Sequence, residues 1–234
     1  MEITTRPEHG IPGSTVTSIT LGGAGVNTMQ FNAGAPAYSF TLTGPATFPI
    51  FGSIVNNSSN QPTFTLSATS PNVANLIFEN AAANAIIITN AGGNTEFVAS
   101  STAANATITN NNGGTLQFLN TATAGSATIT TNSGGLTEFE NQATGGSARL
   151  ITNAGRTVDL SLLASGFTGM TAGSIEGAGA YALGGFTFTV GSNNLSTTVS
   201  GTIQGPGDLV KVGTGTLTLT EHSEQIVSER LVLA

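Results

Sequence analysis

The feature that most constrains this chain is a segment, Thr95 to Thr157, in which one pattern recurs every 21 residues. Four kinds of position repeat at that interval: an aromatic, an aliphatic, an amide and a glycine position. Their members are Phe97, Phe118, Phe139 and Leu160; Ile87, Ile108, Ile129 and Leu150; Asn90, Asn111, Asn132 and Asn153; and Gly92, Gly113, Gly134 and Gly155. An internal period of this length indicates stacked repeats, each of which buries its apolar face against the next.

The local pattern within each repeat is that of strands and turns. Short runs alternate between apolar and polar residues and are bounded by Gly and Asn, which is typical of β-strands. No window has a convincing apolar period of 3.6, and a repeat of about 20 residues is too short for a helix plus a strand. We therefore predict an all-β fold, a parallel β-helix (β-solenoid) with coils of about 21 residues.

Stacked coils place equivalent positions above one another at about 4.8 Å. We expect the Phe and Ile positions to form columns inside the solenoid. The Asn positions should form a ladder of side-chain amides at a corner, each bonded to its neighbours above and below. The Gly positions should supply the left-handed backbone conformation that a sharp corner requires.

The rest of the chain divides around this block. Gly44 to Gly52 contains two prolines, which favours a bend or an edge strand over a central strand. The expected parts are a flexible lead-in (1–20), a single β-helix (21–220) and an atypical charged tail (221–234). Within the β-helix we expect irregular first coils (21–70), regular repeats (71–160), an irregular Gly/Ala-rich coil or an insertion (161–185) and a last segment (186–220).

Composition excludes several functions. Charged residues make up only 7% of the 234 residues and the net charge is −7, so no basic patch exists for nucleic acid. The chain has no cysteine, which excludes disulfides, thiolate metal sites and cysteine catalysis. Its two histidines, His9 and His222, lie outside the predicted solenoid, so we expect no histidine base there. We predict no metal and no cofactor.

One acidic column could carry chemistry. Glu96, Gln117, Glu138 and Asp159 recur every 21 residues and point outward by alternation. Glu138 and Asp159 would lie about one strand spacing apart, close enough to share a cation or to act as an acid/base pair on a polysaccharide. The simpler interpretation is a solvated edge.

Threonines suggest a third hypothesis. Thr107 and Thr109 flank one buried position, and Thr128 and Thr130 flank the next, which gives two stacked T-x-T rows. Flat T-x-T arrays on β-solenoids can order water and bind ice. The neighbouring rows read Ile86/Ile88 and Arg149/Ile151, so we expect an array only two rows tall, and Thr is also simply a good strand former.

The segment Gly201 to Thr220, GTIQGPGDLVKVGTGTLTLT, resembles the passenger-associated transport repeat (autotransporter-associated β-strand repeat) of bacterial autotransporters. That repeat has the form G-x-I-x-G-x-G-x-L-x-K-x-G-x-G-x-L-x-L. The matching residues are Gly201, Ile203, Gly205, Gly207, Leu209, Lys211, Gly213, Gly215, Leu217 and Leu219. With the upstream repeats, the resemblance covers roughly residues 20–220.

This resemblance implies a right-handed parallel β-helix that is exported by type V secretion through an outer-membrane β-barrel translocator. The protein would be displayed at the bacterial surface or secreted, as a non-enzymatic scaffold for adhesion or aggregation, with host surfaces or further copies of itself as partners. The N-terminus lacks the order of a signal peptide, and the tail after Thr220 departs from the family pattern. We therefore expect a passenger fragment. The alternative is a carbohydrate-active β-helix, such as a polysaccharide lyase or a tailspike-like depolymerase.

Overall fold

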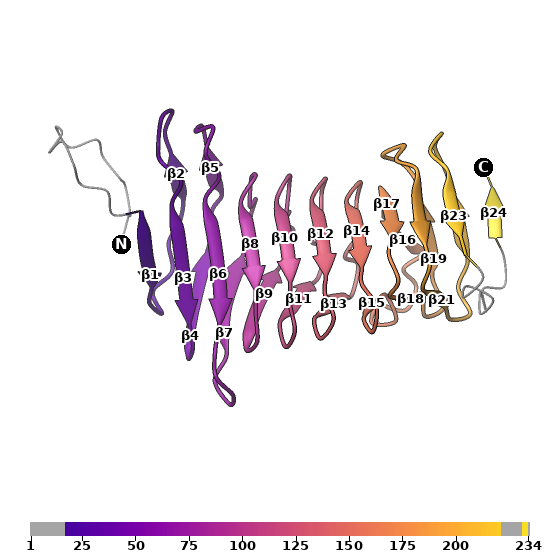
Figure 1. Ribbon diagram of the computed structural model, residues 1–234, viewed down its shortest axis with the longest axis horizontal. Helices are drawn as coiled ribbons and strands as arrows, with labels where there is room; N and C mark the ends of the chain where they lie inside the picture. The colour runs from indigo at the N-terminus through magenta and orange to yellow at the C-terminus, as the bar shows by residue number, and fades with distance from the viewer. Residues whose placement is uncertain (1–16, 221–230, 234) are drawn as a thin grey trace, which may run out of the picture.

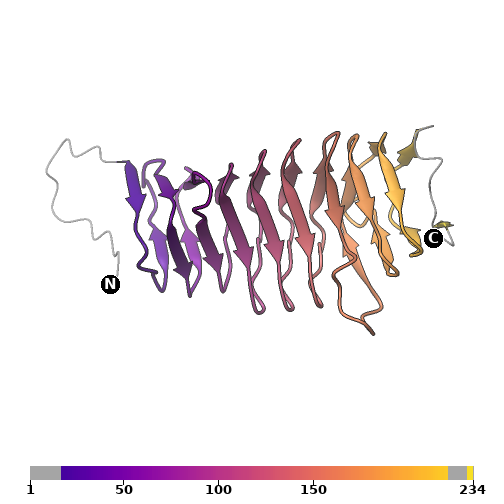
Figure 2. The ribbon, with the colours of Figure 1, turned by 90° about the horizontal axis from the view of Figure 1, so that it is seen from below.

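The computed structural model describes residues 17–220 and 231–233. These residues contain no helix; their strands wind into about 10 coils stacked along one axis (Figure 1). Seen from below, the same coils form one elongated body with β1 and β24 at opposite ends (Figure 2). The predicted all-β parallel solenoid with coils of about 21 residues is confirmed.

Each coil passes three sides in turn. The first side, sheet A, is parallel and eight-stranded, and it continues into β20 and β23 through a bridge from Gly177 to Val199. The eight strands of sheet A are β1 (Ser18–Leu21), β3 (Ser39–Thr43), β6 (Thr63–Ser67), β8 (Ile86–Thr89), β10 (Thr107–Asn110), β12 (Thr128–Thr131), β14 (Arg149–Thr152) and β17 (Ser174–Glu176). The two strands that continue this side, β20 (Thr197–Val199) and β23 (Leu217–Leu219), pair with each other.

The second side, sheet B, is also parallel and has eight strands. In chain order they are β4 (Ala46–Ile50), β7 (Ala74–Phe78), β9 (Gly93–Phe97), β11 (Thr115–Phe118), β13 (Leu136–Phe139), β15 (Thr157–Asp159), β18 (Ala180–Ala182) and β21 (Thr202–Gln204). The proline-containing strand β4 lies at one end of this sheet, as the prolines predict.

The third side, side C, has regular strands only near its two ends. They are β2 (Met29–Phe31), β5 (Ile54–Asn56), β16 (Gly169–Ala172), β19 (Thr187–Val190), β22 (Leu209–Lys211) and β24 (Leu231–Leu233). Between β5 and β16, single parallel bridges connect Ala81, Thr102, Thr123 and Thr144. Two residues after each of these bridge positions the backbone has positive φ, at Ala83, Ala104, Gly125 and Gly146, so a turn follows the bridge.

The predicted inner columns are confirmed. The rings of Phe78, Phe97, Phe118 and Phe139 stack with centroids 4.8, 4.9 and 4.8 Å apart and interplanar angles of 8°, 8° and 7°. Leu160 is buried in the next coil. The aliphatic column of Ile87, Ile108, Ile129 and Leu150 is fully buried on sheet A and paired in register. Because a ring fills the full coil spacing, each Phe is packed from above and below.

The predicted amide ladder is also confirmed. Asn111 Nδ2 donates to Asn90 Oδ1 at 2.9 Å, Asn132 to Asn111 at 2.8 Å, and Asn153 to Asn132 at 2.7 Å. The glycines two residues further along each have positive φ, from 71° at Gly92 to 89° at Gly134. The corner between sheets A and B is therefore built from the same two residue types in four successive coils.

Three boundaries differ from the sequence prediction or were left open by it. Strand β1 begins at Ser18, inside the predicted lead-in, because its residues pair with β3; residues 1–16 and His9 lie outside the described part. Residues 161–185 form an irregular coil, with β16, β17 and β18 each paired to a neighbouring coil, and not an insertion. In the tail, Leu231–Leu233 pairs with β22 as a strand, while residues 221–230, with His222, are outside the described residues.

The irregular coil is fixed by a buried tyrosine. Tyr181 takes the inner position above Val158 on sheet B, and its hydroxyl lies 2.9 Å from the Leu150 carbonyl oxygen and 2.8 Å from the Glu176 carbonyl oxygen. The same hydroxyl accepts the Glu176 N–H at 3.1 Å. Burial raises the pKa of this phenol, so the group stays neutral and satisfies the backbone where β17 leaves the regular repeat.

Candidate functional site

The acidic column lies on the outer face of sheet B, as alternation predicts. Gln117 pairs in register with Glu96 on one side and Glu138 on the other, and Glu138 pairs with Asp159. All four are partly exposed while their chain neighbours on either side point inward. The column therefore forms one continuous stripe across four coils.

Gln117 lies between Glu96 and Glu138 in this stripe. Its Nε2 donates to Glu138 Oε2 at 3.0 Å and to Glu140 Oε1 at 3.2 Å. Partial burial raises the pKa of Glu138; the Gln117 hydrogen bond opposes that shift, and the charges of Glu140 and Asp159 add to it. Burial likewise raises the pKa of Glu96, against a hydrogen bond from Asn94.

Among the described residues, no group of three or more His, Cys, Asp and Glu side chains is placed to hold a metal ion. The Arg149 guanidinium is directed to Glu176 instead, with Nε 2.5 Å from Oε1. Glu138 and Asp159 lie side by side on the outer surface of sheet B, and in the described part of the chain neither forms an ion pair.

A change at Glu138 tests this electrostatic description. Because folding raises its pKa, the folded protein binds protons more tightly than the unfolded chain, and this contribution to stability falls as pH rises through the folded pKa. Glu138→Gln keeps an acceptor for Gln117 but removes the charge. We expect it to raise the urea midpoint at pH 7 and to change it less at pH 4.

The matched control for that measurement is Glu79→Gln, which removes an exposed carboxylate directly after β7 of sheet B. We expect little change in its urea midpoint at pH 7. An unchanged or lowered midpoint for Glu138→Gln at pH 7 would show that the charge of Glu138 does not destabilise the folded protein.

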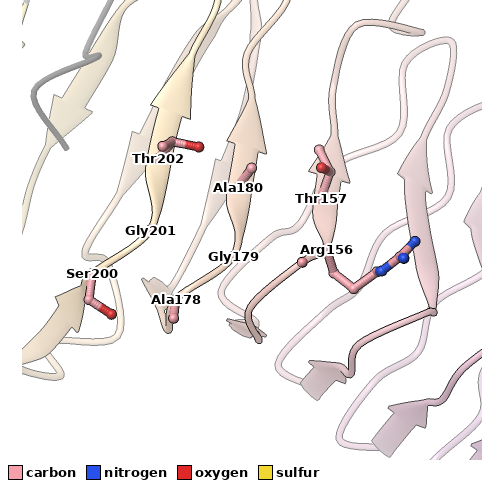
Figure 3. A pocket seen from close by; sticks show the side chains of 9 residues that line it. Arg156, Thr157, Ala178, Gly179, Ala180, Ser200, Gly201 and Thr202 are labelled. Atoms are coloured by element: carbon pink, nitrogen blue, oxygen red, sulfur yellow. The ribbon is translucent and has the colours of Figure 1, made fainter. Parts of the chain in front are cut away.

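A surface hollow lies elsewhere, at the corner before β15, β18 and β21 (Figure 3). It has a volume of about 390 Å³ and is lined mainly by small residues, including Ala178, Gly179 and Gly201. Arg156 borders it, but its guanidinium extends away from these residues (Figure 3). Another hollow, of about 300 Å³, lies near Thr43 and Asn90. Neither hollow includes a carboxylate of the stripe.

The segment resembling a transport repeat forms one complete coil, with β21, β22 and β23 on the three sides in turn. Ile203 and Leu209 are fully buried, while Leu217 and Leu219 pack partly against the core. Lys211 Nζ donates to the carbonyl oxygens of Val212 at 2.6 Å and Gly213 at 3.1 Å. The lysine of this segment therefore caps a corner of the backbone.

The glycines of that segment are needed for close packing between coils. A Cβ at Gly201 would lie 1.8 Å from the Gly179 carbonyl oxygen, and Gly213 has φ of +71°. Gly205 also has positive φ, and Gly207 and Gly215 approach the backbone of the preceding coil. The spacing of these glycines thus follows from the shape of the coil.

On the outer face of sheet A, the sequence prediction missed several rows of outward Thr and Ser residues. Beyond the Ile86/Ile88 row, the register brings Thr63 and Thr65 into the same two columns as Thr107 and Thr109. Ser39/Thr41 and Ser18/Thr20 follow in β3 and β1. The coils from Ser39 to Thr63 and from Thr63 to Ile86 are 24 and 23 residues long, so a fixed 21-residue spacing could not connect these rows to the repeat block. Strand alternation, SFTLT and TFTLS, was the available signal.

Fold and surfaces together define the class: a three-sided parallel β-solenoid with sparse charge. Comparisons of the chain with protein-family models, with curated proteins and with solved structures find no match. In the described residues there is also no helix of the length and apolarity that a membrane span requires.

Proposed function

We propose that this chain is a structural passenger segment of a bacterial autotransporter, a scaffold for adhesion or aggregation at the cell surface. The observation that carries the proposal is the fit between the Gly201–Thr220 pattern and one complete coil. Apolar positions of the pattern point into the core, and its glycines lie where coils approach closely or turn sharply.

The scaffold's mechanism follows from its one-dimensional packing. Each coil binds only the coils above and below, through strand pairing, ring stacking and the Asn ladder. Stability in such a stack is a sum over neighbours, so folding that starts in one coil propagates to the next. A chain emerging through a translocator would fold coil by coil outside, driven by burial and requiring no nucleotide.

Export of the full chain tests the proposal. The 234 residues are fused between a signal peptide and an outer-membrane β-barrel translocator, and surface display is measured by protease accessibility on intact cells. We expect display of a protease-resistant solenoid for the native sequence and for Gly185→Ala, and reduced display for Gly201→Ala. Retention of the native sequence inside the cell would contradict the proposal. Release of unsaturated sugars from pectin by the purified chain would favour the carbohydrate-active alternative instead.

A further inference from the structure

The outer face of sheet A carries a two-dimensional array of small, uncharged side chains. We define the hydroxyl face as the outward residues of six neighbouring strands, which lie side by side in Figure 1. Its rows are Ser18/Thr20, Ser39/Thr41, Thr63/Thr65, Ile86/Ile88, Thr107/Thr109 and Thr128/Thr130. Five of these six rows present two hydroxyls.

The array is regular in both directions. Perpendicular to the strands, the rows repeat at the spacing of the coils. The rings of Phe40 and Phe64, packed behind this face, have centroids 4.9 Å apart. Along each strand, the two columns are separated by two residues, about 6.6–6.8 Å. Threonine is restricted at χ1, so its hydroxyl and methyl groups keep fixed positions on this grid.

The hydroxyls of the face are available to solvent. Within the described chain, none of their side chains makes a hydrogen bond to another protein group. No charged residue occurs in these six strands. The nearest charge along the sheet is Arg149 in β14, which is paired with Glu176 and so marks the end of the face.

We propose that the hydroxyl face binds ice. A rigid grid of hydroxyl and methyl groups can hold a water layer whose spacing is repeated in two dimensions, and ice is the ligand that has such a lattice. Charges would hold their own hydration shells, and they are absent. A protein partner would call for aromatic or Arg anchors in the centre of the face, and none of the six rows has one. This inference is independent of the proposed export function.

The test uses the full chain and measures thermal hysteresis and the shape of growing ice crystals. We expect both effects for the native protein and their loss in Thr109→Arg, which puts a long cation on the fifth of the six rows of the face. Thr65→Arg, two strands away in β6, should show the same loss. Two separate positions guard against a folding defect in either one.

The matched control is Thr115→Arg, an outward substitution on sheet B that should leave ice activity unchanged. Circular dichroism and melting temperature check that each variant is folded. If the native chain neither produces hysteresis nor shapes ice, the proposal is wrong. It is also wrong if folded Thr109→Arg and Thr65→Arg remain as active as the native protein, or if Thr115→Arg loses activity to the same extent.

Discussion

Phe118→Ala is expected to lower the free energy of unfolding by about 3–5 kcal/mol, the usual cost of truncating a buried Phe. Phe118 has no exposed surface and stacks on Phe97 and Phe139 at 4.9 and 4.8 Å. Alanine would leave a cavity between the rings of Phe97 and Phe139. The coils cannot collapse into it, because their separation is fixed by strand pairing on sheet B.

Urea denaturation and thermal melting measure this change, with roughly 2–4 °C of melting temperature expected per kcal/mol in a chain of this size. Thr115→Ala, an outward change in the same strand, is the control and should stay within about 0.5 kcal/mol of the native protein. Because each coil contacts only its neighbours, protease cuts should appear first in the coils around Phe118. An equal loss of stability in both variants would contradict the packing described for β11.

The core of the repeat block could be predicted from the sequence because its coils have equal length. When Phe97 and Phe118 are separated by the same interval as Ile87 and Ile108, a single stacking distance aligns both pairs. Strand alternation then decides which residues point inward. The Asn ladder followed in the same way, since identical amides at one corner must meet at the coil spacing.

Register outside the block could not be predicted, because loops change coil length without disturbing the columns. Thr65 aligns with Ile88, and Leu150 with Ile175. The sequence alone does not show how many residues belong to the loops between these strands, so it does not give this alignment. The third side of the repeat coils, side C, could not be predicted for another reason. Its bridges at Thr102, Thr123 and Thr144 are single pairs, too short for an alternating pattern.

The candidate site was predicted in position but not in chemistry. Alternation placed Glu138 and Asp159 side by side on the outer surface. It could not reveal that Gln117 bonds to both Glu138 and Glu140, nor that Arg149 pairs with Glu176 on the neighbouring strand of sheet A. Side-chain partners in a solenoid depend on rotamers and on the neighbouring coil, and a one-dimensional pattern contains neither.

Gly201→Ala is expected to destabilise the coil of β21, β22 and β23 by about 1–3 kcal/mol, and by more if the neighbouring backbone cannot shift. The added methyl would lie 1.8 Å from the Gly179 carbonyl oxygen and 2.6 Å from the carbonyl carbons of Ala178 and Gly179. These are backbone atoms, so no side chain can rotate aside. The strain would fall on the pairing of β18 with β21, and this last coil should detach first.

Limited proteolysis followed by mass spectrometry measures this detachment, with early cuts expected after β18 and protection retained in the repeat block. Gly185→Ala is the matched control, because a Cβ there has no neighbour within 4 Å and its φ is not in the left-handed region. It should be cut like the native protein. Since stability in a stack passes from neighbour to neighbour, loss of protection throughout the chain in Gly201→Ala would mean that this coil holds the whole solenoid together. Unchanged protection would contradict the prediction that a methyl group at Gly201 destabilises this coil.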